Sequence, residues 1–275
     1  MPLPVFAELG KSAKDILSKD YSYDKKLSLK STTSSGVVFN AAGSSLPSGP
    51  IGGELAIKGK QGPAGISAKV DTAGKVSADL EVADAFTKGL KLVFRGLYPE
   101  PMVGTAAAEY RQDKFTATAF IDSGLKVGSS VVVGVTDSIS AGGNVEYDTN
   151  KGVPTKYDAA VSYGKAGDFV VTAAARNKLG EYAASYVHHL NATTSVAGEF
   201  VHKKSDRSNT FTLGGLYKLD KTSYVRAKID TEGVASVAYS QELRPKVTFV
   251  VAGQVNTRTL DKDSHKLGFA LVIDQ

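Results

Sequence analysis

Apolar and polar residues alternate one by one along most of this chain, from about residue 25 to its end. In residues 51–57 and 76–82 every second position is apolar or glycine, and residues 66–70, 115–121, 247–255 and 267–273 repeat the pattern. A period of two places successive side chains on opposite faces of an extended backbone. The alternation therefore predicts a chain made almost entirely of β-strands, about nineteen of them.

Short polar segments separate the predicted strands. They include residues 47–50 (PSGP), 61–65 (QGPAG), 148–152 (DTNKG) and 230–233 (DTEG), whose composition is typical of hairpin turns. Each strand with its turn has about thirteen residues, and a membrane-spanning strand takes about 9–11 of them. No linker or change of composition divides this region, so we expect residues 25–275 to form one β-domain.

The first 24 residues follow a different period. The apolar positions that recur at helical spacing are Val5, Leu9, Ala13, Ile16 and Leu17. They predict one amphipathic helix, with lysines at positions 11, 14 and 19 on its other faces. Gly10 in the middle of this segment weakens the helix by about 1 kcal/mol relative to alanine.

Two architectures fit so many alternating strands: a closed barrel that spans a membrane, and a soluble sandwich or repeat-type β protein. The apolar face is rich in Ala, Gly and Val, which would leave a sandwich core thin, and basic residues recur along most of the polar face. Nineteen strands also exceed what an open twisted sheet usually tolerates. These features favour the barrel, because closure removes the unpaired edges that lipid does not tolerate.

Composition excludes several function classes. The chain has no Cys, which rules out disulfides, cysteine-ligated zinc and thiol catalysis. No phosphate-binding loop, dinucleotide fingerprint or nucleophile elbow occurs, and no pattern suggests nucleic-acid binding, so we predict no enzyme and no cofactor. No apolar run is long enough for a transmembrane helix, and no secretory signal or Arg-rich presequence is visible. The net charge of +5 favours anions as partners.

The segment SYVHHLNATTSVAGEFVH, residues 185–202, holds three of the four histidines and a glycosylation-type sequon at Asn191. His188 and His189 are adjacent, so on a strand they point to opposite faces and cannot chelate one metal together. His202 lies far along the next predicted strand. We therefore interpret the segment as a hairpin with histidines at a membrane edge, and predict no metal site.

Three motifs in order resemble the mitochondrial outer-membrane porins, the voltage-dependent anion channels. Residues 6–21 (FAELGKSAKDILSKDY) are similar to the family's N-terminal helix, and Gly89, Leu90 and Lys91 match its Gly-Leu-Lys motif. Residues 217–239 match its C-terminal signature at Tyr217, Asp220, Ala227, Lys228, Ile229, Asp230 and Tyr239. Residues 243–258 (LRPKVTFVVAGQVNTR) are most similar to the plant branch. The resemblance implies a nineteen-stranded barrel, antiparallel except for one parallel closing pair, with the helix inside the pore.

The resemblance also implies a function: a voltage-dependent, weakly anion-selective diffusion channel for ATP, ADP, phosphate and small organic anions across the mitochondrial outer membrane. Pore-lining residues that we expect to interact with anions are Lys11, Lys14, Lys19, Lys91, Arg95, Arg226 and Lys228. The expected partners are membrane lipid and these permeants; homo-oligomerisation stays open.

One position departs from some animal members of that family, which carry a lipid-facing glutamate on the fourth strand. Ala68 stands there in this chain. The departure removes the basis for the hexokinase docking and carbodiimide sensitivity attributed to that glutamate. Two other functions fit part of this pattern: a protein-import pore on the same fold, which would need a large N-terminal extension, and a soluble β-rich binding protein.

Overall fold

The computed structural model describes residues 3–45, 49, 51–84, 86–99, 102–165, 167–261 and 265–275. Its helical elements are a short 3-10 turn, η1 (Phe6–Glu8), and one α-helix, α1 (Lys11–Ser18). The strands are β1 (Lys25–Thr32), β2 (Val38–Ser45), β3 (Ile51–Gln61), β4 (Ala64–Asp71), β5 (Val76–Ala83), β6 (Leu90–Tyr98), β7 (Val103–Arg111), β8 (Phe115–Asp122), β9 (Lys126–Gly134), β10 (Ile139–Asp148), β11 (Val153–Lys165), β12 (Phe169–Arg176), β13 (Glu181–His189), β14 (Thr194–Lys203), β15 (Ser208–Lys218), β16 (Ser223–Asp230), β17 (Val234–Arg244), β18 (Val247–Asn256) and β19 (Lys266–Asp274). The turn predicted at residues 47–50 lies mostly outside the described residues.

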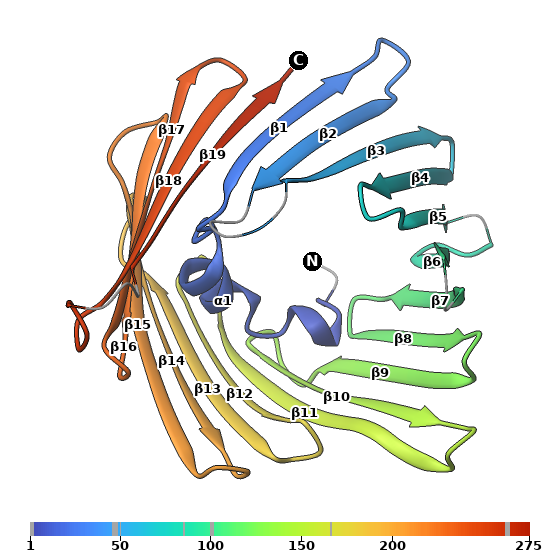
Figure 1. Ribbon diagram of the computed structural model, residues 1–275. Helices are drawn as coiled ribbons and strands as arrows, with labels where there is room; N and C mark the ends of the chain where they lie inside the picture. The colour runs from blue at the N-terminus through green and yellow to red at the C-terminus, as the bar shows by residue number, and fades with distance from the viewer. Residues whose placement is uncertain are drawn as a thin grey trace.

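The strands form one closed barrel. Each strand pairs with its neighbour in the sequence, and β1 also pairs with β19, so that all nineteen belong to a single sheet. Figure 1 shows them as a ring with the N-terminal segment inside. The strand count and the barrel predicted from the alternation are confirmed.

The seam between the first and last strands is the one parallel pairing. It runs from Lys25 opposite Phe269 to Lys30 opposite Asp274, whereas every other described pairing is antiparallel. An odd number of strands in up-and-down order makes the first and last run the same way. The Lys30 ammonium and the Asp274 carboxylate form an ion pair of 2.7 Å across this seam, and the amide of Gln275 donates to the carbonyl of Lys30.

Side chains alternate between the lumen and the outer surface, as a closed sheet requires. On β13 the inward Ala183 and Val187 are buried, whereas the outward Tyr182 and Tyr186 are about two-fifths exposed. The outer surface carries large apolar side chains from strands all round the barrel. This belt of exposed apolar residues has the alternation of a membrane-spanning barrel.

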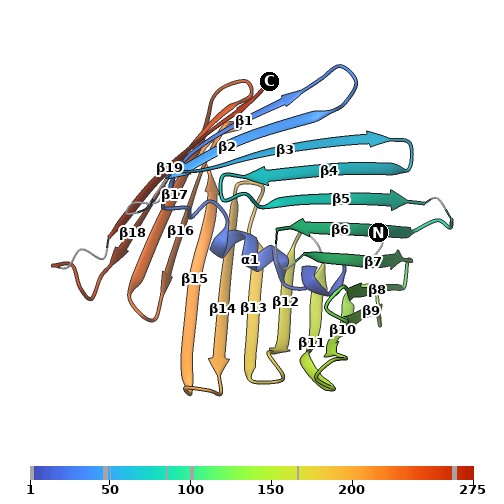
Figure 2. The ribbon, with the colours of Figure 1, turned by 45° about the vertical axis from the view of Figure 1, so that its right-hand side comes forward.

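The N-terminal segment lies in the lumen across the inner face of β13–β16 (Figures 1 and 2). The prediction of one continuous helix is wrong, because the helix breaks at Gly10. Gly10 has a φ of 77°, a left-handed conformation that glycine adopts at little cost. The break separates η1 from α1 and gives each a different part of the wall to contact. Within the described residues, no helix is long and apolar enough to cross a membrane.

Gly268 marks where this segment joins the barrel. A Cβ at Gly268 would collide with the backbone of Tyr23 and the carbonyl of Ser22, so only glycine lets the linker cross β19 here. The sequence indicates an inward polar position that would accept serine. That expectation is wrong. Alternation shows which face of the sheet position 268 belongs to, but it does not show that the linker at Ser22 and Tyr23 passes directly over this position.

The seam register can be tested with cysteines, since the chain has no native Cys. The pair Leu27→Cys with Leu271→Cys should form a disulfide in the folded barrel, because these residues are direct partners. The pair Leu29→Cys with Leu271→Cys, suggested by alternation alone, is out of register by two residues and should cross-link far less. Non-reducing gel mobility measures both. A failure of the first pair, while a β18–β19 control pair cross-links, would mean that the barrel is open.

The outward face should reject charge. Phe249→Arg places a guanidinium among outward apolar side chains and should destabilise the barrel in a bilayer by up to about 2–4 kcal/mol, the cost at the midplane. Thr248→Lys on the inward face of the same strand is the matched control and should fold normally. Urea titrations in lipid vesicles measure the free energies of unfolding. Equal tolerance at positions 248 and 249 would contradict the assignment of faces.

Candidate functional site

The C-terminal part of the lumen segment is held by Arg226 on β16. This guanidinium is buried, with its Nε 3.1 Å from the Asp20 carboxylate, and it donates to the main-chain carbonyl of Asp15. The Tyr224 hydroxyl also donates to Asp20, at 2.9 Å. A buried charge is tolerated only when it is paired and hydrogen-bonded. Arg226 therefore fixes the end of α1 to the wall.

Apolar contacts complete this attachment. Ala13, Ile16 and Leu17 are buried against Val187 and Ala197 on the inner face of β13 and β14. These are the residues that the sequence predicts for the apolar face of the helix. Burial of each large side chain contributes roughly 1.5–3 kcal/mol. The helix is thus bound along one wall rather than suspended in the lumen.

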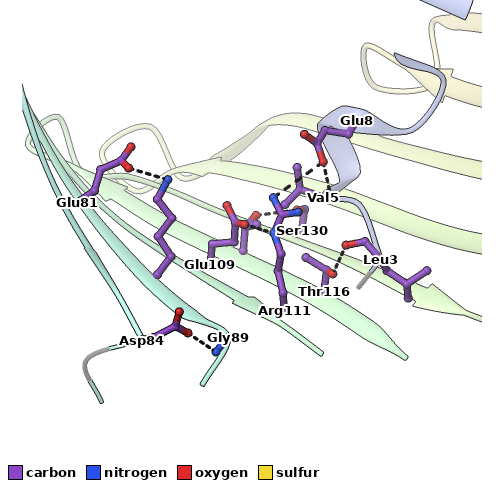
Figure 3. A network of polar contacts seen from close by, with 12 residues as sticks. Leu3, Val5, Glu8, Glu81, Asp84, Gly89, Glu109, Arg111, Thr116 and Ser130 are labelled. Atoms are coloured by element: carbon purple, nitrogen blue, oxygen red, sulfur yellow. Dashed lines mark hydrogen bonds and ion pairs between the residues drawn. The ribbon is translucent and has the colours of Figure 1, made fainter. Parts of the chain in front are cut away.

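The N-terminal part of the segment contacts a different part of the wall, shown in Figure 3. The Thr116 hydroxyl on β8 donates to the carbonyl of Leu3 at 2.8 Å. The Glu8 carboxylate lies 3.9 Å from the Arg111 guanidinium on β7 and 3.8 Å from the Lys11 ammonium. Arg111 also pairs with Glu109 on its own strand. Thr116, which makes the hydrogen bond, is buried, whereas the ion pairs of Glu8 are longer and more exposed than the pair of Arg226 with Asp20.

The Gly-Leu-Lys motif shapes the start of β6. Gly89 has a φ of 88°, and a Cβ there would collide with the carbonyl of Arg111. Its amide donates to the Asp84 carboxylate at 2.7 Å (Figure 3). Two residues on, the Lys91 ammonium turns into the lumen and pairs with Glu81 at 2.9 Å. Glycine at position 89 allows a tight turn into β6, and this turn directs the Lys91 side chain into the lumen.

Ion pairs between adjacent strands neutralise many inward basic residues. Besides Lys91 with Glu81, Arg95 pairs with Asp79 at 2.7 Å, and Lys69 pairs with Glu54 at 2.6 Å. All of these side chains are partly exposed to the lumen, so each pair contributes little to stability. Their effect is on the field in the pore, because each pair presents a dipole in place of a free charge.

Several inward lysines form no ion pair within the described residues, among them Lys58 on β3 and Lys266 on β19, and three others lie at the wall that carries the helix. Lys14 and Lys19 are exposed on and next to α1. The Lys228 ammonium on β16 lies 4.6 Å from the centre of the Tyr21 ring, in a cation–π contact. These lysines present the least compensated positive charge toward the space beside the helix.

The histidines of the hairpin at residues 185–202 have local partners. The Nδ1 of His188 is 3.0 Å from the Tyr186 hydroxyl on the outer face, and that of His189 is 2.7 Å from Ser195 on the inner face. The opposite orientation predicted for them is confirmed. No group of three metal-ligating side chains occurs in the described ranges. The Asn191 side chain accepts the amides of Thr193 and Thr194, so the sequon forms a tight turn.

The family model for eukaryotic porins matches residues 3–268. The chain belongs to the eukaryotic porin family. It is 33% identical to the mitochondrial outer membrane protein porin of 34 kDa from Solanum tuberosum, over 98% of this chain and 97% of the relative.

Two further relatives extend the comparison. The porin is 30% identical to mitochondrial outer membrane protein porin 6 of Oryza sativa subsp. japonica, over 99% of this chain and 98% of the relative. It is also 30% identical to the non-selective voltage-gated ion channel VDAC2 of Xenopus laevis, over 98% and 99%. Like its plant relatives, it is a porin of the mitochondrial outer membrane.

The porin brings together only some of the basic residues singled out from sequence. Arg226, Lys228 and the helix lysines meet on one wall, whereas Lys91 and Arg95 lie on β6, nine strands from β16 around the sheet. Lys11 pairs with Glu8 at the break of the helix. Their contact with permeant anions stays a prediction, and it suits Arg226 least because that side chain is buried.

Sequence reasoning missed the acidic partners. Asp79, Glu81 and Glu54 alternate with apolar residues, as the basic residues do. Acidic and basic residues therefore share one face on neighbouring predicted strands, and this pattern could have predicted the ion pairs. The partner of Arg226 carried no such signal, because Asp20 lies in the linker and is more than 200 positions away.

The structure accounts for two further positions singled out in the sequence, the signature residue Asp220 and the departure at Ala68. Asp220 ends the β15–β16 turn: its carboxylate accepts bonds from Ser223 and Thr222, and these hydrogen bonds lower the pKa of Asp220 to about 2. Ala68 lies exposed on the outer face of β4, the face on which the sequence places it.

The anchoring role of Arg226 can be tested with Asp20→Asn. The change leaves a buried guanidinium without its ion pair, which should weaken helix docking by about 1–3 kcal/mol. A spin label at Ser18→Cys should become more mobile by electron paramagnetic resonance. Asp15→Asn is the matched control: it removes the same charge from the same segment, but Arg226 uses only the main-chain carbonyl there. Equal mobility in both variants would contradict the anchor.

Proposed function

We propose that this porin is a voltage-dependent, weakly anion-selective channel through which ATP, ADP, phosphate and small organic anions diffuse. The observation that carries the proposal is the position of Lys14, Lys19 and Lys228 on the wall of the lumen that carries the helix, without ion-pair partners in the described part of the chain. The names of the relatives support channel activity and voltage gating.

The width of the barrel supports passage of metabolites. Nineteen strands about 4.8 Å apart, tilted by about 40°, give a backbone diameter of roughly 38 Å. A helix about 10 Å wide along one wall leaves an aqueous path wider than a nucleotide. In a pore of this width, ions keep their hydration, so selectivity comes from the charge of the lumen rather than from a narrow filter.

Weak selectivity follows from the ion pairs. Salt bridges such as Arg95 with Asp79 and Lys91 with Glu81 leave little net charge on the β5–β6 wall. The wall that carries the helix keeps its free ammonium groups. Anions therefore meet a modest attraction on one side of the lumen, and cations are not excluded.

We infer that the protein catalyses no reaction and requires no cofactor, since diffusion down a gradient needs neither. Its partners in this proposal are membrane lipid and the permeant anions. Hexokinase-type docking has no support at Ala68, which offers no carboxylate to the outer surface.

Charge reversal on the helix wall tests the proposal. Lys14→Glu with Lys19→Glu should move the reversal potential in a KCl gradient from the anion side toward the cation side, because the lumen field changes sign locally. Lys75→Glu with Lys246→Glu, in exposed turns outside the strands, is the matched control. Turn charges beyond about 8–10 Å are screened at physiological salt, so the control should shift the potential little. Equal shifts in the two variants would overturn the lumen assignment.

A further inference from the structure

One edge of the barrel carries a basic and aromatic cluster that the channel function does not use. Tyr182, His202 and Asn209 are direct partners across β13, β14 and β15, and all three are on the outer face. The His202 ring stacks on Tyr182 with 6.4 Å between ring centres and 19° between planes. The Nδ1–H of His202 donates to the Asn209 side-chain oxygen at 2.7 Å. Each ring is thereby held in place at the edge of the membrane-facing belt.

A lysine completes the cluster. The Lys204 ammonium lies 5.0 Å from the centre of the Tyr182 ring. The Lys204 amide donates to the carbonyl of Gly180 at 2.8 Å, which ties the β14–β15 turn to the β12–β13 turn. Figure 2 shows these two turns side by side at the lower edge of the barrel. Lys204 forms no ion pair within the described residues, so its charge is available to a ligand.

The charges around Lys204 are mostly positive. Lys178 and Arg207 are exposed in the same two turns. Asp206 is the acidic residue of these turns, and its carboxylate accepts the amide and hydroxyl of Ser208. Glu181 begins β13 on the inner face, toward Arg176. The opposite edge differs, because Asp168 lies 3.8 Å from His188 there and would repel an anion.

An apolar trough adjoins the cluster on the outer wall. Its volume is about 570 Å³, and Tyr182 belongs to both features. Its floor consists of small outward side chains and one side is formed by aromatic rings: Ala141, Ala159, Ala173, Ala175, Ala184, Tyr182 and Phe200. Neighbouring outward positions carry larger residues such as Tyr163 and Phe211. A groove of this kind accepts hydrocarbon, because lipid chains and its lining are both apolar.

We propose that the outer face of β10–β15 is a binding site for an anionic phospholipid. The phosphodiester lies at the Lys204–His202–Tyr182 cluster, and an acyl chain occupies the trough. Basic residues at the membrane surface attract anionic headgroups, and aromatic rings favour the depth at which headgroups meet hydrocarbon.

A second copy of the chain fits this face less well than a lipid does. A symmetric pair built on it would bring the same surface of both copies together. The Lys204 ammonium and its neighbours would then face their own copies without a carboxylate to compensate them. A lipid phosphate supplies the missing negative charge.

A tryptophan reporter tests the site, because the chain has no native Trp. Phe200→Trp places the reporter beside the trough, and Phe39→Trp on β2 is a matched outward control. Each is reconstituted in vesicles of phosphatidylcholine and phosphatidylglycerol, with brominated chains on one lipid or the other. Phosphatidylglycerol should quench the reporter at position 200 with about fivefold preference, the factor expected for one basic residue at an anionic surface. The reporter at position 39 should show no preference.

Two variants assign the preference to the cluster and the trough. In the Phe200→Trp background, Lys204→Gln should abolish the preference, whereas Lys75→Gln, an exposed turn lysine elsewhere on the same edge, should leave it. Ala184→Leu should reduce quenching by both lipids as it fills the trough, and Ala68→Leu on the outer face of β4 should not. Unchanged bilayer conductance shows that each variant is folded and keeps the channel intact.

Three results would overturn the site. Equal preference at positions 200 and 39 would mean that lipid is distributed uniformly around the barrel. Equal losses in Lys204→Gln and Lys75→Gln would mean a general surface charge effect. Poor quenching by both lipids at position 200 alone would mean that another copy covers this face. None of these results depends on anion selectivity, so a failure of the lipid site is separate from a failure of the proposed channel.

Discussion

Every backbone amide and carbonyl at membrane depth must find a partner within the protein, because lipid offers none. This constraint requires the sheet to close. With nineteen strands in up-and-down order, closure requires β1 and β19 to pair in parallel. The seam is reinforced at its end, where Lys30 pairs with Asp274 and the amide of Thr32 donates to the terminal residue Gln275. The position of every other strand follows from this closure.

Closure also creates the lumen, and the lumen helix then determines which wall residues can be large. Under α1 some inward positions must be small: Ala197 is buried, and a Cβ at Gly214 would collide with Leu17. Val187 and Leu216 fill the space beside them. Close packing of this kind requires a matched wall, because interiors tolerate few voids and few overlaps. The ion pair between Arg226 and Asp20 also fixes the orientation of the segment, because an ion pair with little exposure requires one geometry. The two ends of the segment are held differently, with a buried anchor near Asp20 and exposed contacts near Glu8.

Charge is distributed in three zones with different consequences. Pairs between adjacent strands neutralise much of the inner wall, the helix wall keeps unpaired lysines, and one outer edge gathers basic residues around Tyr182. The net charge of +5 does not reveal this distribution. The proposed selectivity in the pore and the proposed lipid site at the edge depend on separate residues, so each can change without the other.

The sequence by itself determined the strands and their faces, because alternation is a local signal that every strand repeats, and the number of strands with the composition of their faces favoured the closed barrel. It also identified the apolar face of the helix at Ala13, Ile16 and Leu17. Only the tertiary structure decided where that helix ends, which acids pair with which bases, and why Gly268 cannot be serine. The register of the seam belongs to the same group, since Leu271 lies opposite Leu27 rather than Leu29. These features join segments that are far apart in the chain, and their energies depend on distances and close contacts that no local pattern encodes.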